Sequence, residues 1–245
     1  MSDVTSTGTK ERLESEGKPG SQVPECNKAR EAFKWTLASR VVYSVSKFFL
    51  WLTVKVLFRA RYEGTENLPK TGPVLLAPNH ASYIDPPLVG AGIPRRITFL
   101  AKEELFRGLL GWWIRTVGGK PVFRGKGDVG VFRIAEKAFQ NGEVLLLFPE
   151  GTRTHDGRLQ PMRDGIGLIV KRTGVPLVPV GVMGTYDAWP RHRAFPCLKK
   201  VVVRYGKPLD FSELTSAQAG REVYREITNK LGEEIARLCQ QEKEG

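Results

Sequence analysis

The sequence predicts an α/β fold: a single domain with a mixed central β-sheet flanked by helices, preceded by an N-terminal amphipathic helix. Two observations support this prediction. From residue 60 onward, short apolar runs alternate with segments of helical periodicity, which is typical of an α/β domain. Before residue 60, within residues 28–59, lies the most apolar segment of the chain. A chain of 245 residues is long enough for one such domain with a sizeable core.

Charge and cysteine content narrow the class of protein. The net charge of +12 indicates an anionic partner, which is a nucleic acid, a membrane surface or a phosphorylated substrate. Cys26, Cys197 and Cys239 are isolated, so neither a disulfide framework nor a zinc site is predicted, and a reducing, cytosol-facing location fits best. Residues 1–27 are polar and of mixed charge, and we expect a disordered tail without the apolar core of a signal peptide.

Residues 28–59 form the first predicted element. Residues 41–58 are nearly long enough to cross a bilayer, which takes about 20 apolar residues. The polar positions recur at helical steps and fall on one stripe: Arg40, Ser44, Lys47, Lys55 and Arg59. Cations along one side and apolar bulk elsewhere suit a membrane interface, with the lysine stems reaching towards phosphates. We expect residues 34–59 to be an amphipathic helical membrane anchor; a helix packed on the domain remains the alternative, because periodicity does not show what the apolar side touches.

The α/β domain, residues 60–245, begins after this helix. Its expected strands are short runs rich in aliphatic residues, at residues 73–78 (PVLLAP), 97–101 (ITFLA), 143–148 (EVLLLF), 176–180 (PLVPV) and 200–205 (KVVVRY). Helices are expected at residues 86–92, 102–115, 128–140, 163–173 and 216–240.

The segment ELFRGLLGWWIRTVGG, residues 104–119, combines adjacent tryptophans with flanking arginines. Trp112 and Trp113 lie between Arg107 and Arg115, as an interfacial patch requires, because indole favours a boundary between water and an apolar phase. We expect residues 104–117 to be a second candidate for membrane contact, and a core helix remains the alternative.

His80 and Asp85, in NHASYIDPP, come directly after the first predicted strand of the domain. Positions five apart on a regular helix are rotated by about 140°, so the two side chains meet only if His80 lies in the turn before the helix. A histidine at a strand's carboxyl end, with a carboxylate holding its Nδ1, is the arrangement of a general base in acyl transfer. Asp85 and Ser82 also have the spacing of a helix cap ahead of Pro86, so a purely structural role stays open.

The chain offers no obvious nucleophile of its own. The pattern G-x-S-x-G is absent and no cysteine lies in an activating context, so we expect any hydroxyl that His80 activates to belong to the substrate. The other histidines, His155 and His192, have no metal-binding spacing, and no metal is predicted.

FPEGTR, residues 148–153, ends another predicted strand. Gly151 permits close backbone approach, Thr152 supplies a hydroxyl, and Arg153 can hold a phosphate by two parallel hydrogen bonds. Because open α/β sheets bind ligands at the carboxyl ends of their strands, FPEGTR and His80 are expected at one edge. A polar turn with Glu150 and Arg153 at the surface is the alternative.

A third segment, GGKPVFRGKGDVG, contains Arg124 as a further candidate phosphate ligand. Its GKGDVG matches G-x-G-x-x-G, but a dinucleotide site needs an apolar strand directly before it, which is missing here. Loop glycines with Asp128 as a helix cap are the simpler interpretation.

Together these motifs resemble the PlsC-type lysophospholipid and glycerolipid acyltransferase family, most closely the bacterial 1-acyl-glycerol-3-phosphate acyltransferases. NHASYID matches the family's H-x-x-x-x-D block, GGKPVFR approximates its second block, FPEGTR is its third block intact, and VPLVPVGV matches its fourth. AKEEL, residues 101–105, also resembles a recurrent family segment. The resemblance covers roughly residues 60–210, with the blocks in the family's order.

The resemblance implies a reaction without a cofactor or metal. The acyl donor is expected to be acyl-CoA or acyl carrier protein, the acceptor lysophosphatidic acid and the product phosphatidic acid, made in phospholipid biosynthesis. His80 would deprotonate the acceptor hydroxyl and Asp85 would orient His80. The expected substrate-binding residues are Arg124, Glu150, Gly151, Thr152, Arg153 and Lys102, with Glu150 contacting a hydroxyl or ordering the arginines, and Lys102 contacting the phosphate or the developing oxyanion.

Residues 34–59 resemble the helical anchor of bacterial members, which implies a monotopic protein on the cytoplasmic face of the inner (plasma) membrane. Other acceptors stay open: another lysophospholipid, an aminolipid or glycerol-3-phosphate. A peripheral protein that binds anionic lipid without chemistry is the non-enzymatic alternative. No nucleic-acid partner is expected, because no RNA-binding signature with paired aromatic residues occurs.

Overall fold

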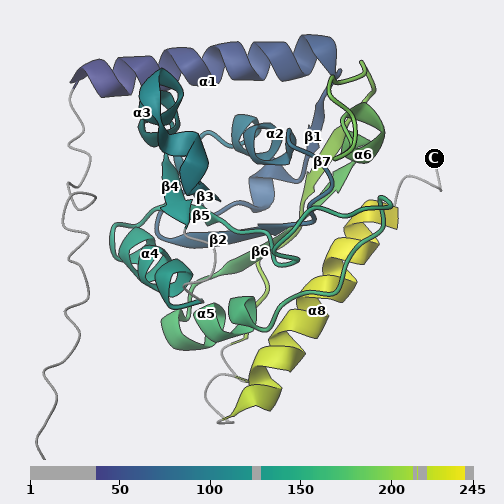
Figure 1. Ribbon diagram of the computed structural model, residues 1–245. Helices are drawn as coiled ribbons and strands as arrows, with labels where there is room; N and C mark the ends of the chain where they lie inside the picture. The colour runs from purple at the N-terminus through teal and green to yellow at the C-terminus, as the bar shows by residue number, and fades with distance from the viewer. Residues whose placement is uncertain (1–36, 123–127, 212–213, 215–219, 241–245) are drawn as a thin grey trace, which may run out of the picture. The chain divides into compact units, whose positions relative to one another are not determined.

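The computed structural model of the protein describes residues 37–122, 128–211, 214 and 220–240. The chain divides into two units, Met1–Lys34 and Trp35–Gly245. The first unit, and with it the predicted polar tail at residues 1–27, lies outside the described residues. Figure 1 shows the elements of the second unit.

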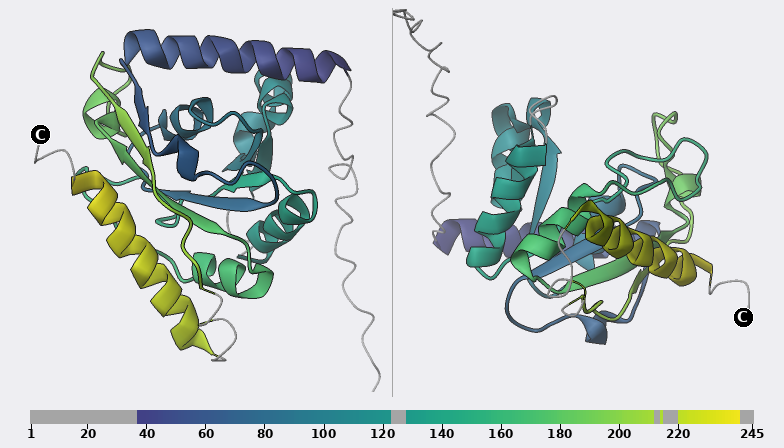
Figure 2. Two further views of the ribbon diagram at one scale, coloured as in Figure 1. Left: turned by 180° about the vertical axis from the view of Figure 1, so that it is seen from behind. Right: turned by 90° about the horizontal axis from the view of Figure 1, so that it is seen from below.

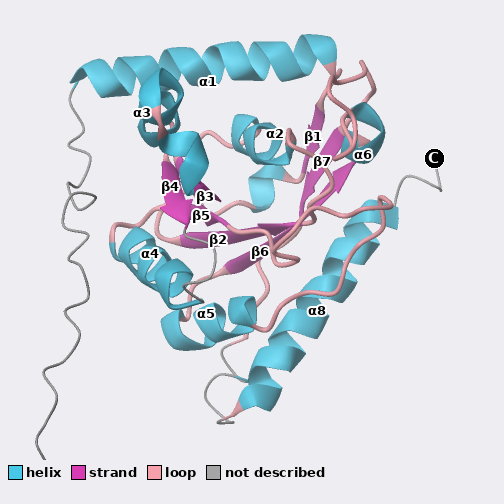
Figure 3. Ribbon diagram, viewed as in Figure 1, coloured by secondary structure: helices cyan, strands magenta, loops and turns pink. Residues whose placement is uncertain are grey.

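A seven-stranded β-sheet forms the centre of the second unit (Figures 1 and 3). Its strands are β1 (Arg61–Glu63), β2 (Val74–Pro78), β3 (Ile97–Lys102), β4 (Gly119–Val122), β5 (Val144–Leu146), β6 (Leu177–Met183) and β7 (Val202–Tyr205). They are ordered β1-β7-β6-β2-β5-β3-β4. Neighbours pair in parallel except β6 and β7, which are antiparallel. The predicted mixed central sheet is therefore confirmed.

Helices cover both faces of the sheet (Figures 1 and 2). One core cluster joins the sheet to α1 (Leu37–Leu57) and α2 (Asp85–Ala91), and another joins it to α4 (Asp128–Gln140), α5 (Gly165–Thr173) and α8 (Arg221–Gln240). Alternate residues of β2 serve the two clusters: Leu76 packs in the first and Leu75 in the second. Because both faces of a central strand are covered, its sequence is apolar throughout rather than alternating.

Three parts of the fold differ from the prediction. β1 and β4 were not expected, because one is short and polar (RYE) and the other contains glycine and proline (GKPV), which strand propensity disfavours. The single helix expected at residues 102–115 is two elements, a 3₁₀ helix at Glu103–Phe106 (η3) and α3 at Gly108–Thr116. Gly108 has a φ of 56°, a left-handed conformation that interrupts the chain between them.

Two residues of the predicted polar stripe, Lys47 and Lys55, turn towards the domain, whereas the other three are exposed. The Lys47 ammonium donates to the backbone carbonyls of Ile93 and Arg95, and Lys55 lies 5.3 Å from the centre of the Tyr62 ring. Burial lowers the pKa of Lys47 to about 8. The prediction that the lysine stems reach towards lipid phosphates is therefore wrong for Lys47. Backbone carbonyls just after the end of α2 accept its hydrogen bonds instead.

The side of α1 away from the domain is apolar. We call the exposed apolar residues of α1 and α3 the apolar face: Leu37, Val41, Val45, Phe48, Phe49, Trp51, Leu52, Val56, Leu57, Leu109, Leu110, Trp112 and Trp113. The Trp113 indole donates to Ser46 Oγ at 3.1 Å, which joins α3 to α1. Among the described helices, α1 alone is long and apolar enough to cross a membrane. The mean hydropathy of its most apolar stretch is 1.2, and 11% of that stretch is buried. Isolated apolar residues are normal on a surface, whereas a continuous face of this kind indicates a contact site.

Candidate active site

The candidate site lies where β2 and β5, neighbours in the sheet, reach their carboxyl ends. Each strand is followed by a turn, which we call the β2 turn (residues 79–84) and the β5 turn (residues 147–154). Both turns border a cavity of about 670 Å³, a size typical of small-molecule sites. This is the edge at which open α/β sheets bind ligands, and it brings together the two motifs that the sequence places apart.

His80 and Asp85 form a hydrogen-bonded pair. His80 Nδ1 lies 2.8 Å from Asp85 Oδ2, and His80 lines the cavity while Asp85 is fully buried beneath it. The backbone N–H groups of Ala81 and Ser82 also donate to Asp85 Oδ2, each at 2.7 Å. An oxygen that already accepts two N–H groups is an acceptor for the ring as well, so Nδ1 carries the proton and Nε2 is left with its lone pair.

Asp85 does not cap α2 as predicted. The helix begins at Asp85 itself, its N-cap is Ile84, and no side chain caps it. The carboxylate instead points back to the β2 turn, because three donors are gathered there, and the bond to Ser82 N–H is half of a capping box. The Ser82 hydroxyl does not form the other half of this capping box. It donates instead to the Trp189 carbonyl at 2.7 Å.

Glu150 lies in the β5 turn and anchors the backbone of the β2 turn. Its Oε1 accepts the backbone N–H of His80 at 2.6 Å, and its Oε2 accepts that of Gln160 at 3.0 Å. The Thr154 N–H donates in turn to the His80 carbonyl at 2.9 Å, so the peptide groups on both sides of His80 are anchored. Burial raises the pKa of Glu150 to about 7 from 4.5, although the two N–H donors oppose the rise. Glu150 is buried and is not among the residues that line the cavity.

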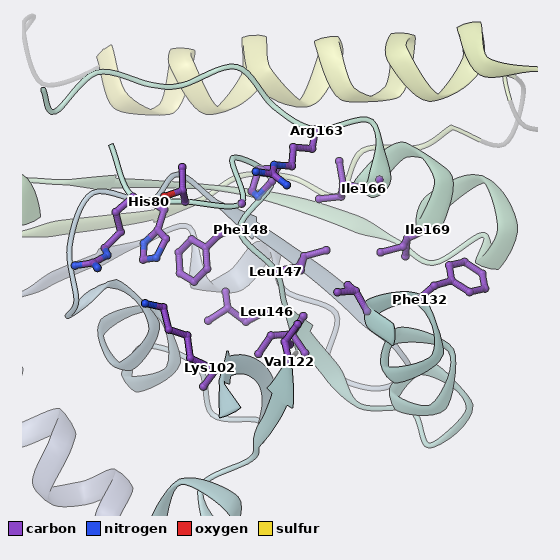
Figure 4. A pocket seen from close by; sticks show the side chains of 18 of the residues that line it. His80, Lys102, Val122, Phe132, Leu146, Leu147, Phe148, Arg163, Ile166 and Ile169 are labelled. Carbon is purple, nitrogen blue, oxygen red and sulfur yellow. The ribbon is translucent and has the colours of Figure 1, made fainter. Parts of the chain in front are cut away.

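Two further contacts shape the cavity around His80. The Phe148 ring stacks on the imidazole with centroids 3.9 Å apart and planes inclined by 24°. Gly151 has a φ of 69°, and a Cβ there would lie 2.6 Å from Nε of Arg163, so only glycine fits beneath that guanidinium. Figure 4 shows Phe148 and Arg163 on the same side of the cavity as His80.

Cations gather at the end of the cavity near His80. Lys102, Arg153, Arg163 and Arg191 line it, together with Thr152. The Arg153 guanidinium lies 3.5 Å from the centre of the Tyr83 ring, and its Nη1 is buried with no hydrogen-bond partner in the described part of the chain. Hydrogen bonding and charge from Arg153 lower the pKa of the Tyr83 hydroxyl. Four cationic side chains at one end of the cavity favour binding of an anion there.

The other end of the cavity is apolar. As Figure 4 shows, Val122 of β4, Phe132 of α4 and Ile166 and Ile169 of α5 lie there, while Leu146 and Leu147 lie between them and His80. The cavity therefore has one end that suits an anion and another that suits a hydrocarbon chain, with His80 and Phe148 at the cationic end.

The structure brings together most of the residues predicted for the site. His80, Lys102, Gly151, Thr152 and Arg153 line the cavity, and Asp85 and Glu150 lie behind its wall. Arg124 lies outside the described residues, as does the glycine loop at residues 125–127.

Sequence reasoning missed four contacts: Tyr83, Phe148, Arg163 and Arg191. Tyr83 and Phe148 lie within motifs that had been singled out, which was a usable signal. Arg163 and Arg191 lie in segments between motifs, where one arginine among 38 basic residues carries no signal.

An α/β sheet covered on both faces, with a hydrogen-bonded histidine–aspartate pair beside a cavity at its strand ends, is an architecture found in enzymes. The chain belongs to the family described as Acyltransferase, whose model matches residues 59–183, about half of the chain. It is similar to the crystal structure of the 1-acyl-sn-glycerophosphate (LPA) acyltransferase PlsC from Thermotoga maritima, with a TM-score of 0.65, 29% identity and coverage of 81% of both chains.

Two curated relatives extend this comparison. A chloroplastic 1-acyl-sn-glycerol-3-phosphate acyltransferase of Brassica napus is 32% identical over 148 residues, which are 58% of this chain and 42% of the relative. A lyso-ornithine lipid O-acyltransferase of Pseudomonas aeruginosa is 35% identical over 125 residues, which are 50% of this chain and 47% of the relative. The chain thus spans less than half the length of each of these two relatives.

Proposed function

We propose that the protein transfers a fatty acyl chain from a thioester, acyl-CoA or acyl carrier protein, to the free hydroxyl of 1-acyl-glycerol-3-phosphate, giving phosphatidic acid for phospholipid synthesis. One observation carries the proposal: the His80–Asp85 pair, 2.8 Å apart, opens into a cavity that is cationic at one end and apolar at the other. The names of the Thermotoga and Brassica proteins support the same acceptor.

The chemistry needs only one base. His80 Nε2 accepts the hydroxyl proton while Asp85 stabilises the imidazolium that forms through Nδ1. The hydroxyl oxygen attacks the thioester carbonyl, the new C–O bond forms and the C–S bond breaks. His80 then returns the proton to the departing thiolate, so the histidine is regenerated and the products are an ester and a free thiol.

The two ends of the cavity match the two parts of an acyl transfer to a lysophospholipid. The acceptor phosphate is assigned to the cationic end, with Arg153 as its main contact, because Arg153 Nη1 is buried and lacks a partner there. Lys102, at the same end, is the candidate for stabilising the developing oxyanion. A fatty acyl chain fits the apolar end between Phe132 and Ile169.

The apolar face supports a location at a membrane, where both lipid substrates reside. We assign α1 to one leaflet rather than to a membrane crossing, because Val54 is buried against the domain and Lys47 is bonded to its backbone. Attachment at the cytoplasmic face of the inner membrane fits the free thiols of Cys197 and Cys239.

A second acceptor, a lyso-ornithine lipid, is favoured by the similarity to the Pseudomonas protein. That lipid carries an amino acid head in place of the glycerol phosphate. The two acceptors therefore differ in how much the cationic end contributes to binding, which an acceptor panel measures directly.

The test is an acyl-transfer assay with purified protein. Palmitoyl-CoA and lysophosphatidic acid should release thiol and form phosphatidic acid, and His80→Ala should lower turnover by about 10⁴-fold. Lysophosphatidic acid and lyso-ornithine lipid are compared under the same conditions, with acyl carrier protein as the alternative donor. Absence of turnover with both donors and all acceptors, with lipid binding kept in His80→Ala, would leave the protein as a lipid binder.

A further inference from the structure

The loop between α6 (Thr185–Ala188) and β7 is strongly basic, and we call residues 190–200 the basic loop. Residues 191–200, RHRAFPCLKK, are all exposed and include four Arg or Lys residues but no acidic residue. Two of its largest apolar side chains are also exposed: 80% of Phe195 and 61% of Leu198 are accessible to solvent. Aromatic and aliphatic groups set among cations form a pattern that suits an anionic lipid surface.

Two hydrogen bonds tie the backbone of the basic loop to residues just before it. The Trp189 indole donates to the Arg193 carbonyl at 3.0 Å, and the Cys197 N–H donates to the Ala188 carbonyl at 2.6 Å. The loop is therefore folded back on its own base. Since Phe195 and Leu198 stay exposed in this arrangement, their exposure does not result from a lack of order in the loop.

The basic loop lies next to the end of α1. The Val201 N–H donates to the Phe58 carbonyl at 3.1 Å, and the Arg61 N–H donates to the Val201 carbonyl at 3.0 Å. Figure 1 and the left view of Figure 2 show the loop after α6 near the C-terminal end of α1. Arg59, also exposed, adds a cation at this corner of the fold. The base of the basic loop is thus joined to the C-terminal end of α1, where the apolar face ends.

We propose that the basic loop is a second membrane-contacting element, which binds anionic phospholipid headgroups through its cations and places Phe195 and Leu198 at the interface. This inference rests on the proposed attachment of α1 to a membrane. An acidic carrier protein would also satisfy the charge, but it would not account for two exposed apolar side chains beside the apolar face. The lipid surface is therefore the occupant that the observations favour.

The location of Arg191 gives the contact a consequence for catalysis. Arg191 belongs to the basic loop and also lines the cavity, where it is 2.9 Å from His155 Nε2. A loop held at the headgroups keeps the cationic end of the cavity at the level of the lipid phosphates. An acceptor then reaches Arg153 without leaving the membrane surface.

The experiment is co-sedimentation of the full chain with vesicles of phosphatidylcholine alone or mixed with phosphatidylglycerol. Lys199→Gln with Lys200→Gln should weaken binding to the mixed vesicles by about tenfold at low salt and leave binding to neutral vesicles unchanged. Phe195→Ser with Leu198→Ser should weaken binding to both kinds of vesicle by about tenfold. All these variants should keep wild-type turnover on lysophosphatidic acid in detergent micelles.

Lys137→Gln with Lys230→Gln is the matched control, because it removes the same two charges from α4 and α8, on the opposite face of the sheet. Equal loss in this control would show that net charge alone drives binding and would overturn the proposal. Unchanged vesicle binding in both loop variants would also overturn the proposal. The same holds if the loop variants lose only the binding of acyl carrier protein, measured separately. If the wild-type protein bound only the mixed vesicles, the proposed role of α1 would be contradicted. Binding of anionic headgroups by the basic loop would still be supported.

Discussion

The β2 turn and the β5 turn stand side by side at one edge of the sheet, and each presents a buried carboxylate. Asp85, directly after the β2 turn, contacts the His80 ring and two backbone N–H groups. Glu150, in the β5 turn, accepts only backbone N–H groups, of His80 and Gln160. The difference shows that what a carboxylate holds depends on the donors it meets: Asp85 contacts the His80 ring itself, whereas Glu150 holds the backbone segment that carries His80.

Asp85→Asn tests the direct role and should have the largest effect. The amide removes the charge that stabilises the imidazolium, so kcat should fall by about 10³- to 10⁴-fold. The free energy of unfolding should change by less than about 2 kcal/mol, because the amide oxygen can accept the same N–H groups. Steady-state kinetics and urea unfolding measure the two quantities. Near-normal turnover would reduce Asp85 to a structural residue.

Glu150→Gln tests the positioning role. The amide keeps one acceptor but places an N–H₂ group against the N–H of Gln160 or His80, which displaces the β2 turn. We expect a fall in kcat of about 10²-fold with little change in the KM for lysophosphatidic acid. A selective rise in that KM would instead support the prediction that Glu150 binds the head group itself.

The raised pKa of Glu150 predicts a pH dependence of stability. Because the pKa in the folded state is about 7 and the ordinary value is 4.5, the folded protein holds this proton to higher pH. The resulting stabilisation is fully present below pH 4.5 and is lost as the pH rises through about 7. Between about pH 5 and about pH 8, wild type should lose roughly 2 kcal/mol relative to Glu150→Gln in urea unfolding. A difference independent of pH would contradict this.

Arg153→Lys tests the cationic end of the cavity and should have the smallest effect of the four. Lysine keeps the charge but loses the planar stacking on Tyr83 and the paired donors, so the KM for lysophosphatidic acid should rise by about tenfold with kcat nearly unchanged. Arg172→Lys is a matched control. Arg172, on α5, also lies over an aromatic ring, that of Phe132 on α4, but it is not among the residues that line the cavity. An equal change in both variants would argue against a specific phosphate contact.

The sequence was sufficient to predict the central strands and the contact between His80 and Asp85. Long apolar runs such as β2 and β6 have few other structures available, and His80 and Asp85 are close enough in the chain for one turn to join them. β1 and β4 were missed because their pairing comes from neighbouring strands and not from their own composition. The break at Gly108 was missed because a glycine inside an apolar run is compatible with a continuous helix.

The direction of a side chain was the harder inference. Lys47 lies on the stripe that periodicity indicates, but its ammonium group turns towards the domain, where it donates to the carbonyls of Ile93 and Arg95 from a distant segment. Glu150 lies in the recognised motif, but only the tertiary structure shows that its oxygens point at backbone N–H groups. Periodicity and motifs place residues on elements, and the partners of those residues depend on packing between elements.

The bond between Glu150 and His80 joins residues 70 positions apart in the chain, whereas His80 and Asp85 are separated by only five. During synthesis Asp85 follows His80 almost at once, whereas Glu150 is added 70 residues after His80. Contacts of large sequence separation form late, because the intervening loop must close first. We therefore expect the proposed activity to appear only once β5 has paired with β2, when most of the sheet is assembled.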